Sequence, residues 1–311
     1  MPLQNTENLE YLIQDQNLEA LNRLAVPVAR VQNPSLSFRS CLMLSTHNLK
    51  HLAKIPSLNA ECIILNLEDG VSSEQKPYAL RLCAIALAKH PKLDKKLVVR
   101  INALDEGGIE EIVYLNPFMP DAIRIPKIRR VEEVQKALEL IDEGIEVHLS
   151  IETKEAWLAL STLACHSRVK AYYLGVLDLF ADLGLSQSLL TPENPTMQYV
   201  LSHFMITARA CGVKPVSFVY QEYKNNDGLR NWLELEKTIG LEAKGCITPN
   251  QVEAVHEIFG NSELEIKKCR TIVTLFEENA ANGITGFVDE RYGFIDEPIY
   301  KGALAVLKSL L

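Results

Sequence analysis

Eight short apolar segments constrain the fold of this chain more than any other feature. They lie at 40–44, 61–67, 97–101, 121–125, 146–151, 169–174, 213–219 and 243–247. Segments with the apolar spacing of amphipathic helices separate most of them, at 73–89, 108–116, 130–143, 154–165, 192–211 and 228–240. Strands that are apolar along their whole length and alternate with such helices are typical of a parallel sheet covered by helices.

The number of these strand–helix units favours a (β/α)8 barrel, the TIM barrel. An open doubly wound sheet is the alternative, but its first strand is normally followed by a glycine-rich turn, and LSTHNLKHL at 44–52 contains no glycine. We therefore predict a barrel catalytic domain at 36–260, preceded by a polar helical extension at 1–35 that ends near Pro34.

The C-terminal end of the chain lies outside this pattern. The sequence predicts helices at 249–260, 262–281 and 299–311, with the glycine-punctuated loop NGITGFVDERYGFIDEP before the last one. We assign residues 261–311 to a tail of helices and loop that caps the barrel or packs on a neighbouring subunit. Asp289 and Asp296 lie on the loop, and either could act as a general acid or base if the loop closes over the barrel mouth.

Composition excludes several classes of partner. The 311 residues carry a formal net charge of −8 and no block of Lys or Arg, so nucleic acid and anionic membrane surfaces are not expected partners. No apolar stretch approaches the length of a membrane span, and the polar N-terminus is unlike a signal peptide. Seven scattered cysteines without a CxxC pair indicate buried thiols in a reducing cytoplasm.

Polar side chains follow nearly every predicted strand, where the active site of a barrel gathers. These strand ends carry His47, Asn48, Glu68, Asp69, Arg100, Asn102, Lys127, Glu152, Asp178, Tyr220, Glu222, Thr248 and Asn250. Each one alone is ordinary, because loops are polar. The set is informative, because acids from the second, fifth and sixth strands would face an arginine from the third strand and a lysine from the fourth.

Glu152 and Asp178 follow adjacent strands and therefore point at the same barrel mouth. Two converging carboxylates repel each other unless a cation or a shared proton neutralises them. Oxygen ligands without His or Cys beside them favour Mg²⁺ or Mn²⁺ over zinc. The alternative is structural: Glu152 would lie near the start of the helix predicted at 154–165, and Asp178 would cap a short helix.

Arg100 lies in the apolar strand VVRIN, so its guanidinium must find an anion. A structural ion pair with Glu68 or Asp69 of the neighbouring strand is one interpretation, and a bidentate clamp on a substrate carboxylate is the other. Glu68 and Asp69 are expected to orient Arg100 or Lys127 and to hold a metal-bound water. Lys127, which ends the fourth strand, is expected to bind substrate beside Arg100.

An ordered series of motifs resembles a known family. It comprises KIPSLNAECIILNLEDGVSSEQK, VVRIN, IPK, SIETKEAW, LGVLDLFADLG, GLEAKGCITPNQV and GFIDEP, from about Phe38 to about Leu304. The series resembles the citrate lyase beta-subunit-like (CitE-like) branch of the HpcH/HpaI aldolase family, which includes malyl-CoA and citramalyl-CoA lyases. The resemblance implies a (β/α)8 barrel that uses Mg²⁺ to cleave a 3-hydroxyacyl-CoA thioester into an acyl thioester and a keto acid.

The resemblance also implies roles for individual residues. Arg100 would bind the substrate, and Arg39 would lie near the acyl partner. Glu152 and Asp178 would bind the metal and, through it, the substrate. Cleavage leaves the acyl thioester as an enolate. Asp296, contributed across a subunit boundary in some members, or a water would protonate this enolate. A homotrimer or homohexamer is implied, with the C-terminal segment packed on a neighbour.

Three positions depart from the family pattern. Ser45-Thr46-His47 replaces VPG after the first strand, Leu177 replaces the Glu before the metal-binding Asp, and Thr248 replaces the His of IHPNQ. The metal pair survives these changes, whereas the identity of the thioester is left open. A malate-synthase-like or thioesterase activity on the same metal site is one alternative. A catalytically inactive member with a role in assembly or ligand sensing is another.

Overall fold

The computed structural model describes residues 6–31, 37–260 and 263–308 of the chain. They belong to two compact units, Met1–Phe259 and Gly260–Leu311, each with a hydrophobic core of its own. None of the described helices is long and apolar enough to cross a membrane.

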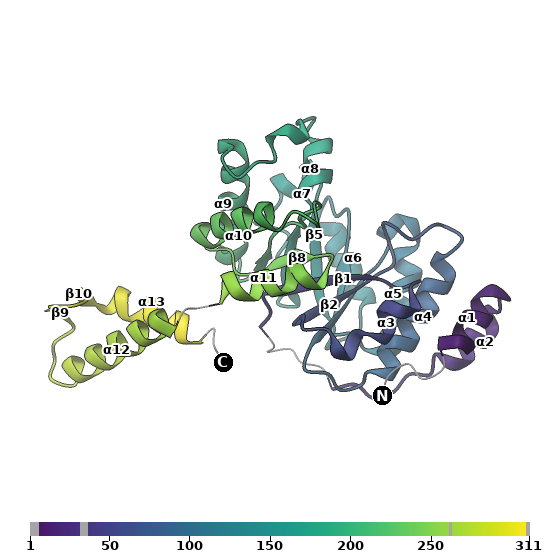
Figure 1. The fold of residues 1–311 in the computed structure, drawn as a ribbon, viewed down its shortest axis with the longest axis horizontal. Coiled ribbons are helices and arrows are strands. Elements are labelled where there is room, and N and C mark those ends of the chain that lie inside the picture. Colours follow the sequence, from purple (N-terminus) through teal and green to yellow (C-terminus); the bar gives the residue numbers. More distant parts are fainter. Residues whose placement is uncertain (1–5, 32–36, 261–262, 309–311) are drawn as a thin grey trace. The chain divides into compact units, whose positions relative to one another are not determined.

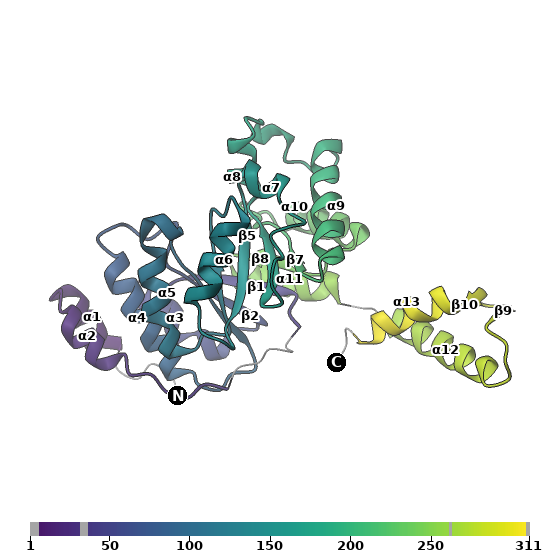
Figure 2. The same cartoon turned by 180° about the vertical axis from the view of Figure 1, so that it is seen from behind.

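Eight parallel strands form the centre of the first unit (Figure 1, Figure 2). They are β1 (Ser40–Ser45), β2 (Cys62–Asn66), β3 (Lys96–Arg100), β4 (Ala122–Ile125), β5 (Glu146–Ile151), β6 (Val169–Leu174), β7 (Lys214–Val216) and β8 (Lys244–Cys246). Each strand from β1 to β7 pairs with the next, and β8 pairs with β1. A parallel bridge between Ser217 and Lys244 joins the end of β7 to β8, so the barrel is nearly closed. The predicted (β/α)8 barrel is confirmed.

Helices cover the outside of this barrel, as Figure 1 shows. They are α3 (Leu49–Ala53), α4 (Lys76–Lys89), α5 (Ile109–Leu115), α6 (Val131–Leu140), α7 (Lys154–Leu158), α8 (Val176–Asp182), α9 (Pro195–Ala210), α10 (Asn226–Ile239) and α11 (Pro249–Phe259). Two further helices, α1 (Thr6–Gln14) and α2 (Leu18–Leu24), precede β1 in the chain. Pro34, where the N-terminal extension is predicted to end, lies outside the described residues.

Alternate residues of each strand face opposite sides of the sheet, which decides what reaches the barrel interior. On β3, Val99 packs against the helices in the main core, whereas Val98 lies in the interior cluster together with Ala122 of β4. Two residues further along each strand, the same inward alternation places Arg100 and Arg124 inside the mouth of the barrel.

The second unit contains a β-hairpin and two helices. They are α12 (Glu263–Ala280), β9 (Gly286–Asp289), β10 (Gly293–Asp296) and α13 (Glu297–Lys308). The sequence predicted an irregular loop where the antiparallel hairpin lies, and that prediction was wrong. Asp289 Oδ1 accepts hydrogen bonds from the backbone N–H groups of Arg291 and Tyr292, and Gly293 has a φ of +75°, which together make a tight turn.

A buried ion pair ties α10 to the seam where β7 meets β8. Lys244 Nζ lies 2.6 Å from Glu236 Oε1, and both side chains are fully buried. Ser217 Oγ donates a hydrogen bond of 2.5 Å to the same oxygen, and Lys244 Nζ lies 4.1 Å from the centroid of the Phe218 ring. Burial raises the pKa of Glu236, although Lys244 and Ser217 both oppose the shift. The two charges at the seam therefore depend on each other.

We expect the Glu236→Leu variant to lose about 3–5 kcal/mol of unfolding free energy, because it leaves the Lys244 ammonium buried without a partner. The double variant Glu236→Leu/Lys244→Met should recover most of this loss, because both charges are then replaced by apolar groups. Urea denaturation followed by the fluorescence of Trp232, which packs edge-on against Phe218, measures both effects. Equal stability of the single variant and the wild type would contradict this role of the pair.

Candidate active site

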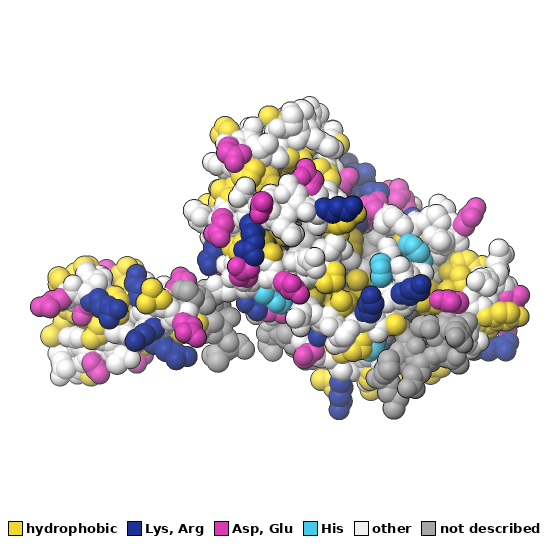
Figure 3. All heavy atoms as spheres, in the orientation of Figure 1, with side chains coloured by type: hydrophobic (Ala, Val, Ile, Leu, Met, Phe, Trp, Pro, Cys, Tyr) yellow, Lys and Arg dark blue, Asp and Glu magenta, His cyan; other side chains and the backbone are white. Residues whose placement is uncertain are grey.

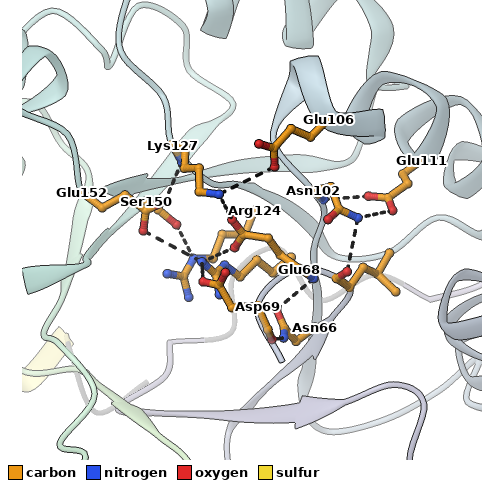
Figure 4. A network of polar contacts seen from close by, with 12 residues as sticks. Asn66, Glu68, Asp69, Asn102, Glu106, Glu111, Arg124, Lys127, Ser150 and Glu152 are labelled. Carbon is orange, nitrogen blue, oxygen red and sulfur yellow. Dashed lines mark hydrogen bonds and ion pairs between the residues drawn. The ribbon is translucent and has the colours of Figure 1, made fainter. Parts of the chain in front are cut away.

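Charged side chains from four consecutive strands meet at the C-terminal mouth of the barrel (Figure 4). Glu68 follows β2, Arg100 ends β3, Lys127 follows β4 and Glu152 follows β5. Parallel pairing places these strand ends side by side, since Asn66 is the register partner of Arg100 and Arg100 that of Arg124. The structure therefore brings together residues that lie far apart in the sequence.

Arg100 lies among three carboxylates. It forms an ion pair with Glu68, its Nη2 donates a hydrogen bond of 3.1 Å to Asp69 Oδ2, and the same nitrogen lies 4.0 Å from Glu152 Oε2. The structural ion pair expected from the sequence is thus present. It does not use the full capacity of the group, because Arg100 Nε is buried without a hydrogen-bond partner among the described residues. That nitrogen keeps an unused hydrogen-bond donor.

Glu68 is a buried acid of the site that has no hydrogen-bond donor among the described residues. Its side chain is only 3% exposed, and neither carboxylate oxygen accepts a hydrogen bond from a described residue. Burial raises the pKa of Glu68; Arg100 opposes the shift, and the charges of Asp69 and Glu152 reinforce it. Glu68 is therefore held by ion pairs alone, with Arg100 and with Lys127.

Lys127 contacts three acids through two of its nitrogen atoms. Its backbone N–H donates a hydrogen bond of 2.6 Å to Glu152 Oε1, and its Nζ lies 3.4 Å from Glu68 Oε1 and 3.7 Å from Glu106 Oε2. Its φ of +51° is unusual for a residue with a side chain and costs conformational energy. Burial lowers the pKa of Lys127, but the carboxylates of Glu68 and Glu106 outweigh it and the net shift is upward. Lys127 is therefore a cation at neutral pH.

Glu152 and Asp178, the predicted metal ligands, lie in different environments. Glu152 is 3% exposed, and no described residue donates a hydrogen bond to its Oε2. Asp178 lies in the first turn of α8, is exposed, and makes no hydrogen bond or ion pair with the described residues. The helix cap is Gly175 rather than Asp178, so the capping role considered above is not the one observed.

Gly175 connects the two predicted ligands. A Cβ atom at this position would lie 2.6 Å from Glu152 Cβ and 2.7 Å from Glu152 Oε2, closer than real atoms approach. Its backbone N–H donates a 3.0 Å hydrogen bond to Ile151 O, which fixes the end of β6 beside the end of β5. A glycine is therefore required at position 175 for the Glu152 carboxylate to occupy its position. Gly175 precedes Asp178 by three residues in the chain.

The available donors suit Mg²⁺. Among the described residues, no group of three or more His, Cys, Asp or Glu side chains is arranged to hold a metal ion. Mg²⁺ commonly takes only one or two protein carboxylates and completes its shell with water and substrate oxygens. The uncommitted Oε2 of Glu152 and the unpaired carboxylate of Asp178 fit that requirement. Their role as metal ligands stays a prediction.

The structure places Arg39 away from this group. Arg39 immediately precedes β1, at the opposite end of the barrel, where its Nε donates a hydrogen bond of 3.0 Å to Glu61 Oε1. Asp296 belongs to the second unit, where its Oδ1 accepts a hydrogen bond of 3.2 Å from the backbone N–H of Ile299 at the start of α13. Their proposed contacts with substrate stay predictions.

Sequence reasoning missed Arg124 and Glu111. Glu111 of α5 is buried and accepts hydrogen bonds from the backbone N–H of Asn102 at 2.7 Å and from its Nδ2, which fixes Asn102 at the mouth. Arg124 is 6% exposed, and its Nε donates a hydrogen bond of 2.9 Å to Ser150 Oγ. An available signal was the alternation within AIRI, which turns Arg124 inward with Ala122.

Known proteins resemble this chain along most of its length. The family model for HpcH/HpaI aldolase/citrate lyase matches residues 39–249. A (3S)-malyl-CoA thioesterase of Cereibacter sphaeroides (strain ATCC 17023) is 30% identical over 247 residues, which cover 79% of this chain and 85% of that protein. The mitochondrial citramalyl-CoA lyase of Rattus norvegicus is 26% identical over 287 residues, covering 85% of this chain and 83% of the lyase.

A solved structure shares the fold. The protein CitE from Mycobacterium tuberculosis, in complex with magnesium, acetoacetate and coenzyme A, superposes with a TM-score of 0.71 at 23% sequence identity. The superposition covers 89% of this chain and 99% of that one. The likeness supports the barrel architecture described above.

We expect Mg²⁺ to raise the thermal midpoint of the wild type by several degrees, because a ligand at about one hundred times its Kd adds about 2.7 kcal/mol to stability. The Glu152→Gln variant should lose this response, because it removes the charge but keeps the shape of the side chain. Thermal denaturation with and without Mg²⁺ measures the effect. Glu242→Gln, an exposed change elsewhere in the first unit, serves as the control. Equal Mg²⁺ responses in wild type and Glu152→Gln would remove Glu152 from the metal site.

Proposed function

Because the chain belongs to the HpcH/HpaI aldolase/citrate lyase family of enzymes, we propose that it cleaves a carbon–carbon bond in a 3-hydroxyacyl-CoA thioester, giving an acyl thioester and a keto acid. The observation that carries the proposal is at the barrel mouth: the buried Glu152 carboxylate, whose Oε2 accepts no hydrogen bond from a described residue, lies 4.0 Å from the guanidinium of Arg100. A metal-binding acid beside a carboxylate-binding cation is what a hydroxy acid substrate requires. The similarity to a citramalyl-CoA lyase supports the same conclusion.

The reaction breaks the bond between the carbon that bears the hydroxyl group and the carbon next to the thioester carbonyl. The bonding electron pair passes to the thioester, which becomes an enolate, while the hydroxyl group loses its proton and becomes the ketone of the keto acid. Mg²⁺ or Mn²⁺ held by Glu152 and Asp178 would supply a Lewis acid that lowers the pKa of that hydroxyl group. A proton added to the enolate carbon completes the cleavage.

Each side chain of the mouth has a part in this proposal. Arg100 holds the carboxylate next to the hydroxyl group, and its free Nε provides a further donor. Glu68 and Asp69 keep Arg100 in place through their ion pairs, and Glu68 also holds the Lys127 ammonium. Asp296 of the second unit, or a water molecule, donates the proton to the enolate.

A cavity beside Lys127 offers room for the thioester. Its volume is about 210 Å³, and its walls come from the segments that follow β3 and β4, including Leu104, Ile109 and Ile128. Arg129 and Lys136 also line it, together with Asp105 and Glu133, and we assign the two cations to phosphate groups of CoA. On the face shown in Figure 3, acidic and basic side chains of the described residues are interspersed. This mixture supports a small molecule rather than nucleic acid as the partner.

Assembly and location complete the proposal. We place the chain in a homotrimer or homohexamer in which the second unit packs on a neighbouring subunit, supported by the exposed apolar side chains of Val288 and Phe294 on its hairpin. We place it in the cytoplasm, because all seven cysteines are free.

Thioester hydrolysis at the same site is a second candidate, favoured by the 30% identity to a (3S)-malyl-CoA thioesterase. The two reactions differ in their products. A lyase releases a keto acid and keeps the thioester bond, whereas a thioesterase releases free CoA and no keto acid.

We expect a panel of malyl-CoA, citramalyl-CoA and citryl-CoA to contain at least one substrate that yields a keto acid in the presence of Mg²⁺. Keto acid is measured by its hydrazone and free CoA by a thiol reagent in parallel assays. The Gly175→Ala variant should lower keto-acid release about 100-fold, because the new Cβ displaces the Glu152 carboxylate and misplaced catalytic groups carry penalties of that size. Release of CoA without keto acid would replace the lyase proposal with the thioesterase. Release of neither would contradict both.

A further inference from the structure

Arg124 is a second guanidinium at the mouth, and the proposed reaction does not yet use it. It is the register partner of Arg100 on the adjacent strand and faces the same interior. Its guanidinium carbon lies 4.2 Å from the centroid of the Tyr173 ring, and its Nε donates to Ser150 Oγ. These contacts hold the flat side chain by one face and one edge. The Nη1 and Nη2 atoms make no hydrogen bond with a described residue (Figure 4).

Arg124 also lacks a counter-ion, unlike the other buried cations. The described part of the chain buries five Lys and Arg residues, and four of them have a carboxylate oxygen within 4.0 Å: Lys95, Lys96, Arg100 and Lys244. No described carboxylate lies within that distance of Arg124. Burial, and then the charge of Arg100, lower the pKa of Arg124 to about 10; the more distant charges of Glu152 and Glu68 oppose the shift, and Arg124 stays positive at neutral pH. A buried charge without a partner is costly, so its presence points to an anion supplied from outside.

The position of Arg124 restricts the anion to the acid end of the substrate. The side chain is 6% exposed and lies within the barrel, so we assign it a small group at the reacting end of the substrate rather than the bulky CoA moiety. Arg100 already serves the carboxylate beside the hydroxyl group. A carboxylate matches the two free nitrogens of Arg124 in a bidentate pair.

We propose that Arg124 binds a second carboxylate of the substrate, so that the preferred keto acid product is a dicarboxylate. This inference rests on the proposed lyase function and narrows it to a citryl-type thioester, whose keto acid carries two carboxylates. Arg124 is then a specificity-determining residue. The monocarboxylate products of malyl-type and citramalyl-type thioesters would leave its guanidinium unpaired, which is the penalty that discriminates against them.

Oxaloacetate and pyruvate test the proposal, because they differ by one carboxylate. Isothermal titration of each acid into the full-length protein with Mg²⁺ gives two dissociation constants. The wild type should bind oxaloacetate more tightly. Arg124→Met should raise the dissociation constant of oxaloacetate about 30-fold or more, as expected for loss of one partner of a buried charge pair. It should leave the dissociation constant of pyruvate unchanged. Arg124→Lys, which keeps the charge without the planar fork, should retain part of the preference.

Two controls separate this role from a general defect. Arg230→Met removes an exposed arginine that is ion-paired with Glu257 on the outside of the barrel, and should change neither dissociation constant. The thermal response of Arg124→Met to Mg²⁺ should equal that of the wild type, which shows that the variant is folded and that Glu152 is in place.

Three results would overturn the inference. An equal loss of affinity for both acids in Arg124→Met would show that Arg124 shares one carboxylate with Arg100. Equal affinity of the wild type for both acids would remove the second carboxylate site while leaving the lyase function intact. Binding of neither acid by the wild type would overturn the inference together with the proposed function.

Discussion

The mouth of the barrel depends on the ion pair between Arg100 and Glu68. Both side chains are almost fully buried, as is Glu152 beside them, and isolated charges in such places cost several kcal/mol. The ladder of parallel strands solves this problem, because it holds the ends of β2 to β5 side by side and thereby brings opposite charges together. A change in strand register would turn these side chains outward, so the chemistry of the mouth depends on the pairing below it.

The sequence was sufficient to predict the barrel, because each strand is apolar on both faces and each connection is long enough for a helix. Arg100 could be identified because a guanidinium in an apolar strand stands out. Arg124 occupies a similar position in AIRI, but its importance comes from having no carboxylate of the described residues within 4.0 Å, which only the structure reveals. The hairpin that ends at Asp296 was missed because its glycines suggested a loop, although Gly293 serves to tighten a turn.

The two ends of the barrel interior differ in how fully their polar groups are satisfied. Toward the N-terminal end, Lys96 Nζ lies 2.6 Å from Glu146 Oε2, the same oxygen lies 3.2 Å from His148 Nε2, and Tyr173 OH lies 3.3 Å from His148 Nδ1. Burial lowers the pKa of His148, so the ring is neutral and the network is closed. At the mouth, buried atoms of Arg100 and Glu68 keep unused hydrogen-bonding capacity. Unsatisfied buried groups are rare in proteins, and those of Arg100 and Glu68 lie where a ligand would bind in a barrel.

The predicted metal site depends on a glycine, Gly175, as well as on two acids. Where β5 and β6 end, a Cβ atom on Gly175 would lie 2.6 Å from Glu152 Cβ. Because Gly175 has no side chain, the Glu152 carboxylate can lie against its backbone. The same glycine caps α8, whose first turn carries Asp178. In the segment GVLD, the glycine makes room for the Glu152 carboxylate and the aspartate is Asp178 itself. A sequence search for paired acids alone finds the two carboxylates but not the glycine.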